Sequence, residues 1–125
     1  MKESSVGSKK VLVAIVDDHV QTAVAISQIL EFNGFRTFQA YNIEEAIQKI
    51  KSENPDLAII EFMLDGESGV DLAKKFPKLK VIFLTGSELT ESDLKGVRKL
   101  VGIVKKPISN DEILELVRKE FEIKG

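Results

Sequence analysis

The stretch LAIIE at positions 57–61 has four apolar residues followed by a carboxylate. A short apolar run of this kind is typical of a strand that is buried on both faces, as in the parallel sheets of α/β proteins. A side chain that follows such a strand lies at the carboxyl edge of the sheet, where α/β folds bind their ligands. Glu61 is therefore the first candidate for a functional residue.

Three further apolar runs, VLVAIV, VIFL and GIV, are each followed by polar residues, namely Asp17 and Asp18, Thr85, and Lys106. Carboxylate oxygens suit Mg²⁺, whereas a lysine and a hydroxyl group suit the oxygens of a phosphoryl group. Each group has an ordinary explanation when taken alone, since aspartates cap helices and a threonine before glycine is common in turns. Their joint occurrence at four strand ends predicts a site for a divalent cation and a phosphoryl group.

Helical patterns alternate with the apolar runs. A short, more polar strand is expected at 36–40, at an edge of the sheet, and helices are expected at 22–33, 43–53 and 68–75, from Thr90 and from Ser109. Capping-box spacing marks three of the helix starts, at Asn42, Thr90 and Ser109, because an acidic residue follows each three positions later. Alternating strands and helices predict an α/β fold with a five-stranded parallel sheet and helices on both faces.

Length and composition exclude several classes of protein. The 125 residues suit one domain, which we place at 9–125 after a polar leader at 1–8 that we expect to be flexible. The net charge of −2 gives no electrostatic basis for direct nucleic-acid binding, and the absence of cysteine excludes disulfides and thiol chemistry. No apolar stretch approaches the roughly 20 residues that span a membrane, and the start lacks a signal core, so a cytoplasmic protein is expected.

Taken together, the motifs resemble the receiver domain of two-component response regulators. The matching segments are Val16-Asp17-Asp18, Pro55-Asp56-Leu57 leading into Glu61, Gly69 eight positions later, Leu84-Thr85-Gly86 and Lys106-Pro107. The resemblance implies a flavodoxin-like (CheY-like) sheet in the order 2-1-3-4-5. It also implies a signalling role, in which an aspartate at the end of the third strand takes a phosphoryl group from a histidine kinase while Mg²⁺ is bound.

The resemblance also implies roles for particular residues. Asp17 and Asp18 match the acidic pair that binds Mg²⁺, and the backbone carbonyl of Met63, with Glu61, would complete the protein ligands. Thr85 and Lys106 match the hydroxyl and the amine that sense the phosphoryl group.

Three positions depart from the pattern of the family. Glu61 occupies the phosphoacceptor position, Ile103 occupies the switch position where an aromatic residue is usual, and Asp65 replaces a proline. Glutamate is one methylene longer than aspartate, so we expect its carboxylate to pair with Lys106 and to accept a phosphoryl group poorly or not at all. The remaining aspartates, Asp17 and Asp18, are expected to bind Mg²⁺ weakly or to have lost Mg²⁺ binding.

Several functional readings stay open at this stage. The chain is a phosphorylation-independent receiver that binds other proteins, a constitutively active mimic of the phosphorylated state, or an inert relic. A separate class, a small flavodoxin-like phosphatase or nucleotide-binding enzyme, is disfavoured because no glycine-rich loop follows the first strand. His19 is read as an exposed residue at a loop-to-helix junction rather than a metal ligand.

The expected partners are signalling proteins, either a histidine kinase or a downstream output protein. A homodimer through the surface of residues 90–121 is also expected, because that region corresponds to the output face of the family and carries mixed charge. Neither nucleic acid nor a membrane is expected as a direct partner.

Overall fold

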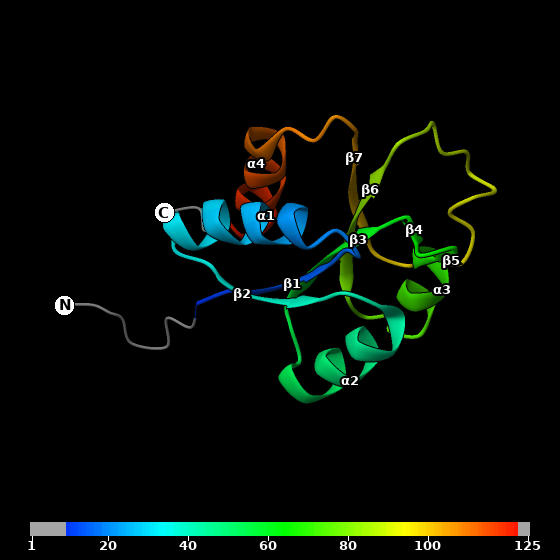
Figure 1. Cartoon of the computed structure of the whole chain (residues 1–125), viewed down its shortest axis with the longest axis horizontal. Coiled ribbons are helices and arrows are strands. Elements are labelled where there is room, and N and C mark those ends of the chain that lie inside the picture. Colours follow the sequence, from blue (N-terminus) through cyan, green and yellow to red (C-terminus); the bar gives the residue numbers. More distant parts are fainter. Residues whose placement is uncertain (1–9, 123–125) are drawn as a thin grey trace.

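The computed structural model describes residues 10–122, so the expected leader at 1–8 lies outside the described residues. Five parallel strands form one sheet in the order β2-β1-β3-β6-β7 (Figure 1). Their bounds are Leu12–Val16 for β1, Arg36–Ala40 for β2, Leu57–Glu61 for β3, Lys80–Thr85 for β6 and Leu100–Lys105 for β7. This is the expected order 2-1-3-4-5, since β4 and β5 form a separate hairpin. The prediction of the fold is confirmed.

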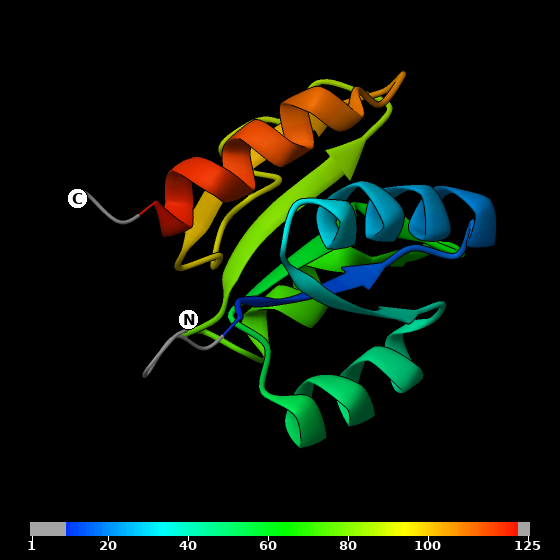
Figure 2. The same ribbon diagram turned by 90° about the vertical axis from the view of Figure 1, so that its left-hand side faces the viewer.

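Four helices cover the two faces of the sheet, with α1 and α4 on one side and α2 and α3 on the other (Figures 1 and 2). Their bounds are Val20–Phe32 for α1, Ile43–Glu53 for α2, Gly69–Lys74 for α3 and Asn110–Phe121 for α4. Side chains alternate along the interior strand β1: Val13 and Ile15 join the core under α1 and α4, whereas Ala14 and Val16 join the core above α2 and α3. Burial on both faces explains why this strand is continuously apolar.

A short hairpin with a two-residue turn connects β3 to α3. It consists of β4 (Met63–Leu64) and β5 (Glu67–Ser68), which pair in the antiparallel sense. The two turn residues have positive φ angles, 48° at Asp65 and 84° at Gly66. An Asp-Gly turn with both φ angles positive has the type I′ character that hairpins favour. The turn expected at Leu64-Asp65-Gly66 is therefore confirmed.

The prediction of a helix that begins at Thr90 is wrong. Residues 91–96 form consecutive turns, and β7 begins at Leu100 without a helix between β6 and β7. The expected capping bonds do form, because the backbone N–H of Thr90 donates to the Asp93 carboxylate and that of Asp93 donates to the Thr90 hydroxyl. The chain then leaves helical geometry at Gly96, where φ is +93°. Only a thin apolar stripe, chiefly Leu94 and Val97, is half-buried, so packing does little to favour a helix.

Candidate functional site

The carboxyl ends of the strands bring the predicted polar residues to one edge of the sheet. Strand β3 ends at Glu61, and its neighbours β1 and β6 lead into Asp17 and Thr85. Lys106 follows β7, and its backbone N–H donates to the carbonyl of Thr85 over 2.8 Å. We call these residues, together with Asp18, the carboxyl-edge site. The sheet register therefore assembles the groups that the sequence placed at four strand ends.

An ion pair joins the acid and the amine of this site. Lys106 Nζ lies 3.0 Å from Glu61 Oε1, with the Glu61 side chain 7% exposed and that of Lys106 34% exposed. The contact is short, but its angles do not satisfy a hydrogen bond, so Oε1 is left without a directional donor among the described residues. The expected Glu61–Lys106 contact is therefore present.

Burial dominates the ionisation of Glu61. Removal from water raises the pKa of its carboxyl group above the usual value, and the negative charges of Asp17 and Asp18 raise it further. The nearby ammonium group of Lys106 lowers the pKa but does not offset these effects. Crowded, buried carboxylates are a costly arrangement that a bound cation relieves.

The aspartate pair has the chemistry of a cation site. Suitable ligand atoms of Asp17, Asp18 and His19 lie within 4.8 Å of one another. The Asp17 side chain is fully buried, and its Oδ1 accepts from the His19 backbone N–H at 2.9 Å. Its other oxygen, Oδ2, has no hydrogen-bond partner in the described chain, and neither has Asp18 Oδ1. Unpartnered, buried carboxylate oxygens fit a hard divalent cation such as Mg²⁺.

His19 has a role at this site that the sequence did not reveal. It is the N-cap of α1, its ring is largely exposed, and its Nδ1 lies 3.3 Å from Asp17 Oδ1. The expectation of an exposed residue at a loop-to-helix junction is correct. The backbone N–H and the ring of His19 both contact Oδ1 of Asp17, whereas Oδ2 has no hydrogen-bond partner among the described residues.

Thr85 is buried at the site, but its hydroxyl is engaged locally. It donates to the carbonyl of Ser87 at 3.1 Å and accepts from the backbone N–H of the same residue. The neighbouring Lys105 pairs with Glu88, away from Glu61. Of the two adjacent lysines, only Lys106 therefore serves the carboxyl-edge site.

The remaining predicted positions lie further out. Ile103, at the switch position, is half-buried in β7 and pairs in register with Phe83. Met63 begins β4, two residues beyond Glu61, and its side chain is exposed, so that only its backbone carbonyl is suited to the expected ligand role.

Gly69 supports the site through a close backbone approach that the sequence could not specify. Its N–H donates to the carbonyl of Phe62 at 2.7 Å. A Cβ atom at this position would lie 2.4 Å from the Glu61 carbonyl oxygen and 2.8 Å from Ile60 Cγ2. Only glycine allows the start of α3 to pack directly on the end of β3, which fixes the backbone of Glu61.

Fold and site together define a signalling module, and comparison with known proteins agrees. The sequence model of the response regulator receiver domain matches residues 13–118, and the chain belongs to this family. It is 28% identical to "Sporulation initiation phosphotransferase F" of Bacillus subtilis, with 90% of this chain and 95% of that protein covered. It is 32% identical to "Sensory transduction protein LytR" of Staphylococcus haemolyticus, with 85% and 50% covered.

A solved structure agrees with the fold. A CheY-like receiver domain from Methanospirillum hungatei has a TM-score of 0.80 at 27% identity, with 90% of this chain and 94% of that one covered. Five other curated relatives are longer, and the chain spans between 28% and 53% of their lengths. Within residues 10–122, none of the helices has the length and apolar character that a membrane crossing requires.

Proposed function

We propose that this receiver domain signals without accepting a phosphoryl group, and that it acts by binding other signalling proteins. Receiver domains in general are non-enzymatic modules that interact with histidine kinases and output domains. The observation that carries the proposal is the buried Glu61 carboxylate lying 3.0 Å from Lys106 Nζ, at the position where the family has its acceptor. In this ion pair, the carboxylate and the amine that would otherwise face an incoming phosphoryl group contact each other instead.

The length of the Glu61 side chain is the physical reason for the proposed lack of acceptor activity. Phosphoryl transfer depends mostly on positioning and on charge stabilisation. A nucleophile displaced by about an ångström loses on the order of a hundredfold in rate. Glu61 is one methylene longer than aspartate, and its reach brings its carboxylate onto Lys106. The amine that would stabilise the phosphoryl oxygens is thereby occupied.

Mg²⁺ binding is part of the proposal, in a weakened form. Asp17, Asp18, Glu61 and the carbonyl of Met63 would hold the ion. The ion would supply positive charge among carboxylates that burial and mutual repulsion otherwise penalise. Because Lys106 already offsets part of the charge on Glu61, affinity is expected to be lower than with an unpaired acid.

A second reading, that Glu61 mimics the phosphorylated state, has one observation in its favour. Its carboxylate contacts the lysine that would sense a phosphoryl group. However, a carboxylate brings one charge where a phosphoryl group brings about two and three acceptor oxygens. The Thr85 hydroxyl is bonded to Ser87 rather than to Glu61, which disfavours the mimic. A nucleotide-binding or phosphatase role has no supporting feature in the described site.

The proposed partner contact also differs from the family pattern. The surface of residues 90–121 was expected to contain a helix from Thr90, yet residues 91–96 form turns. We place the contact on β7 and α4, which remain regular in this region. Homodimerisation through this surface is part of the same proposal.

Intact-mass spectrometry tests the central claim. The chain, incubated with acetyl phosphate and Mg²⁺, is expected to gain no stable phosphoryl group, whereas Glu61→Asp is expected to gain one. The reason is that aspartate withdraws the carboxylate from Lys106. Asp65 is exposed in the hairpin turn four residues later, so Asp65→Asn in both backgrounds identifies any phosphorylation at that position. Stoichiometric phosphorylation of the unaltered chain at Glu61 would overturn the proposal.

A further inference from the structure

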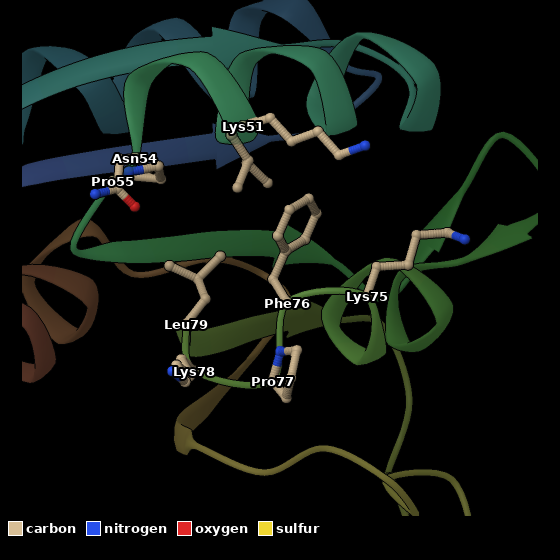
Figure 3. A pocket seen from close by; sticks show the side chains of 9 residues that line it. Lys51, Asn54, Pro55, Lys75, Phe76, Pro77, Lys78 and Leu79 are labelled. Atoms are coloured by element: carbon tan, nitrogen blue, oxygen red, sulfur yellow. The ribbon is translucent and has the colours of Figure 1, made fainter.

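A pocket with no part in the carboxyl-edge site lies at the opposite edge of the sheet. It forms where α2 and α3 end and β6 begins, and it has a volume of about 430 Å³ (Figure 3). Its apolar lining consists of Ile50, Phe76 and Leu79 together with two prolines, Pro55 and Pro77. The Phe76 ring points toward α2 (Figure 3). A hollow of this size and character accepts one large apolar side chain or a small ligand.

This pocket is separate from the carboxyl-edge site. The pocket lies beside the amino end of β3, where Asn54 and Pro55 line it, whereas Glu61 lies at the carboxyl end of the same strand. The five residues of β3 rise about 3.3 Å each, so the two places are roughly 13–16 Å apart along the strand. A ligand in the pocket would not touch Glu61 or the aspartates.

Lysines surround the pocket. Lys51 comes from α2, whereas Lys75 and Lys78 come from the end of α3 and the loop after it; all three line the pocket and are exposed. The side chains of Lys51 and Lys75 extend in the same direction past the Phe76 ring (Figure 3). We call the hollow and these three lysines the basic pocket.

Two further cations extend the basic pocket on one side. A neighbouring hollow is lined by Pro77, Lys78, Arg98 and Lys99, and it shares Pro77 and Lys78 with the first. Positive charge therefore continues from α2 to the start of β7.

None of these five cations forms an ion pair with a carboxylate within residues 10–122. Lys80, just beyond the pocket, differs because it pairs with Glu120 at 2.8 Å. Unpaired positive charge around an apolar hollow is the complement of an acidic ligand with one apolar group.

Helix ends account for only part of this cluster. Lys51 is in the last turn of α2 and Lys75 is the C-cap of α3, where a cation is favourable next to the carboxyl end of a helix. Lys78, Arg98 and Lys99 lie outside every helix, so the same explanation does not apply to them. The helix-end effect therefore accounts for two of the five cations.

We propose that the basic pocket binds an acidic peptide segment of a partner protein. One apolar side chain of the segment enters the hollow between Phe76 and Leu79, and neighbouring carboxylates contact Lys51, Lys75 and Lys78. A membrane surface fits less well, because a concave pocket receives an apolar group and does not insert one. Nucleic acid fits less well because the chain as a whole is acidic.

A labelled peptide with six carboxylates around a central phenylalanine tests the proposal by fluorescence anisotropy on the full chain. Saturable binding is expected. The charge reversals Lys75→Glu and Lys78→Glu together should weaken it at least tenfold. The matched control, Arg36→Glu with Lys119→Glu, makes the same charge change at exposed positions elsewhere and should weaken it less than twofold. A peptide with serine in place of phenylalanine should bind at least fivefold more weakly.

Several results would overturn this proposal. They are the absence of saturable binding at about 1 mM protein, equal weakening by both double variants, and equal binding of the serine peptide. Binding of anionic vesicles or single-stranded DNA, but not of the peptide, that depends on Lys75 and Lys78 would assign the surface to another ligand. Removal of Mg²⁺ or the change Glu61→Asp should leave peptide binding unaltered, so failure of the proposed function is distinguishable from failure here.

Discussion

The regions around the two ends of strand β3 carry opposite charge, and they differ in how far the charged side chains are buried. At the carboxyl end, Glu61 is buried beside the buried Asp17, and Lys106 is the one cation in contact with Glu61 among the described residues. At the amino end, Lys51 and Lys78 are exposed to water. A net charge of −2 therefore conceals two regions of opposite sign at the two edges of one sheet.

Burial determines what each region can do. Desolvation makes the charged form of Glu61 costly at the carboxyl edge despite its contact with Lys106, so changes there should alter stability and cation binding together. Exposed lysines keep their hydration, so changes at the amino edge should alter binding with little effect on stability. The following predictions test this difference, from the largest expected effect to the smallest.

Gly69→Ala should produce the largest loss of stability, about 3 kcal/mol in the free energy of unfolding. A Cβ atom would lie 2.4 Å from the carbonyl oxygen of Glu61, and backbone at the end of a central strand cannot easily move away. Urea unfolding followed by circular dichroism measures the effect. Gly86→Ala is the matched control, since a Cβ there meets nothing within 4 Å, and it should change stability by less than about 0.5 kcal/mol. Equal effects of the two changes would contradict the close approach.

Asp18→Asn should weaken Mg²⁺ binding at least tenfold, equivalent to about 1.4 kcal/mol. The change removes a charge from the group of ligand atoms that lie within 4.8 Å of one another. A titration followed by the amide chemical shifts of Asp17 and Met63 measures the affinity. Asp65→Asn removes the same charge from the exposed hairpin turn and should leave the affinity unchanged. No response to Mg²⁺ in the unaltered chain would show that the cation site is lost.

Glu61→Gln should increase the free energy of unfolding at pH 7.5 in the presence of EDTA. The size of this increase should be smaller than the decrease caused by Gly69→Ala. The pKa of Glu61 is raised in the folded state by burial, so the stability that its protonated form contributes is lost as the pH rises from about 4.5 through the folded pKa. Glutamine has no such loss. The advantage over the unaltered chain should therefore be smaller at pH 4 than at pH 7.5, as measured by urea unfolding at both values.

Glu45→Gln provides a control of opposite sign. The pKa of Glu45 is lowered, first by the hydrogen bond from the backbone N–H of Tyr41 and then by Lys49. Its contribution to stability is present above about pH 4.5 and is lost as the pH falls through the folded pKa. Glu45→Gln should therefore be less stable than the unaltered chain at pH 7.5 and approach it at low pH. The same pH trend in both variants would contradict the assigned causes.

Beryllofluoride, a mimic of the phosphoryl group, should have the smallest effect. We expect it to change the dimerisation constant by less than threefold, which is under about 1 kcal/mol of coupling. The reasons are that Lys106 already contacts Glu61 and that Ile103 cannot reorient as an aromatic side chain would. Sedimentation velocity measures the constant, and Glu61→Asp serves as the responsive control. A larger shift in the unaltered chain would show that the switch survives.

The parts of the fold that depend on local pattern could be predicted from the sequence. Three of the four apolar runs became the buried strands β1, β3 and β6, whereas the fourth lies in β7, where only Val104 is buried. The capping signals at Asn42 and Ser109 form their hydrogen bonds to the backbone N–H groups of Glu45 and Glu112. The signal at Thr90 also forms its bonds, yet no helix follows, because helix growth depends on packing that the segment does not provide. A capping signal therefore indicates local hydrogen bonds rather than the length of a helix.

At the site, sequence order predicted which groups meet but not how each is oriented. The Glu61–Lys106 contact could be anticipated from two strand ends and a longer side chain. Two hydrogen bonds could not be predicted, namely the one from the Thr85 hydroxyl to Ser87 and the one from the His19 backbone N–H to Asp17. They depend on side-chain rotamers and loop geometry, which leave no periodic pattern in the sequence. The tight approach at Gly69 likewise depends on tertiary packing.

The irregular connection between β6 and β7 also makes this chain suitable for receiving inserted sequence. Its ends are fixed by the pairing of Thr85 with Lys105 and by the backbone bond from Val81 to Lys99. Residues 91–93 between these anchors are exposed turns that support no helix. Lengthening a loop costs only about 0.6 kcal/mol for each doubling, so a reporter domain inserted at 91–93 should leave the sheet intact.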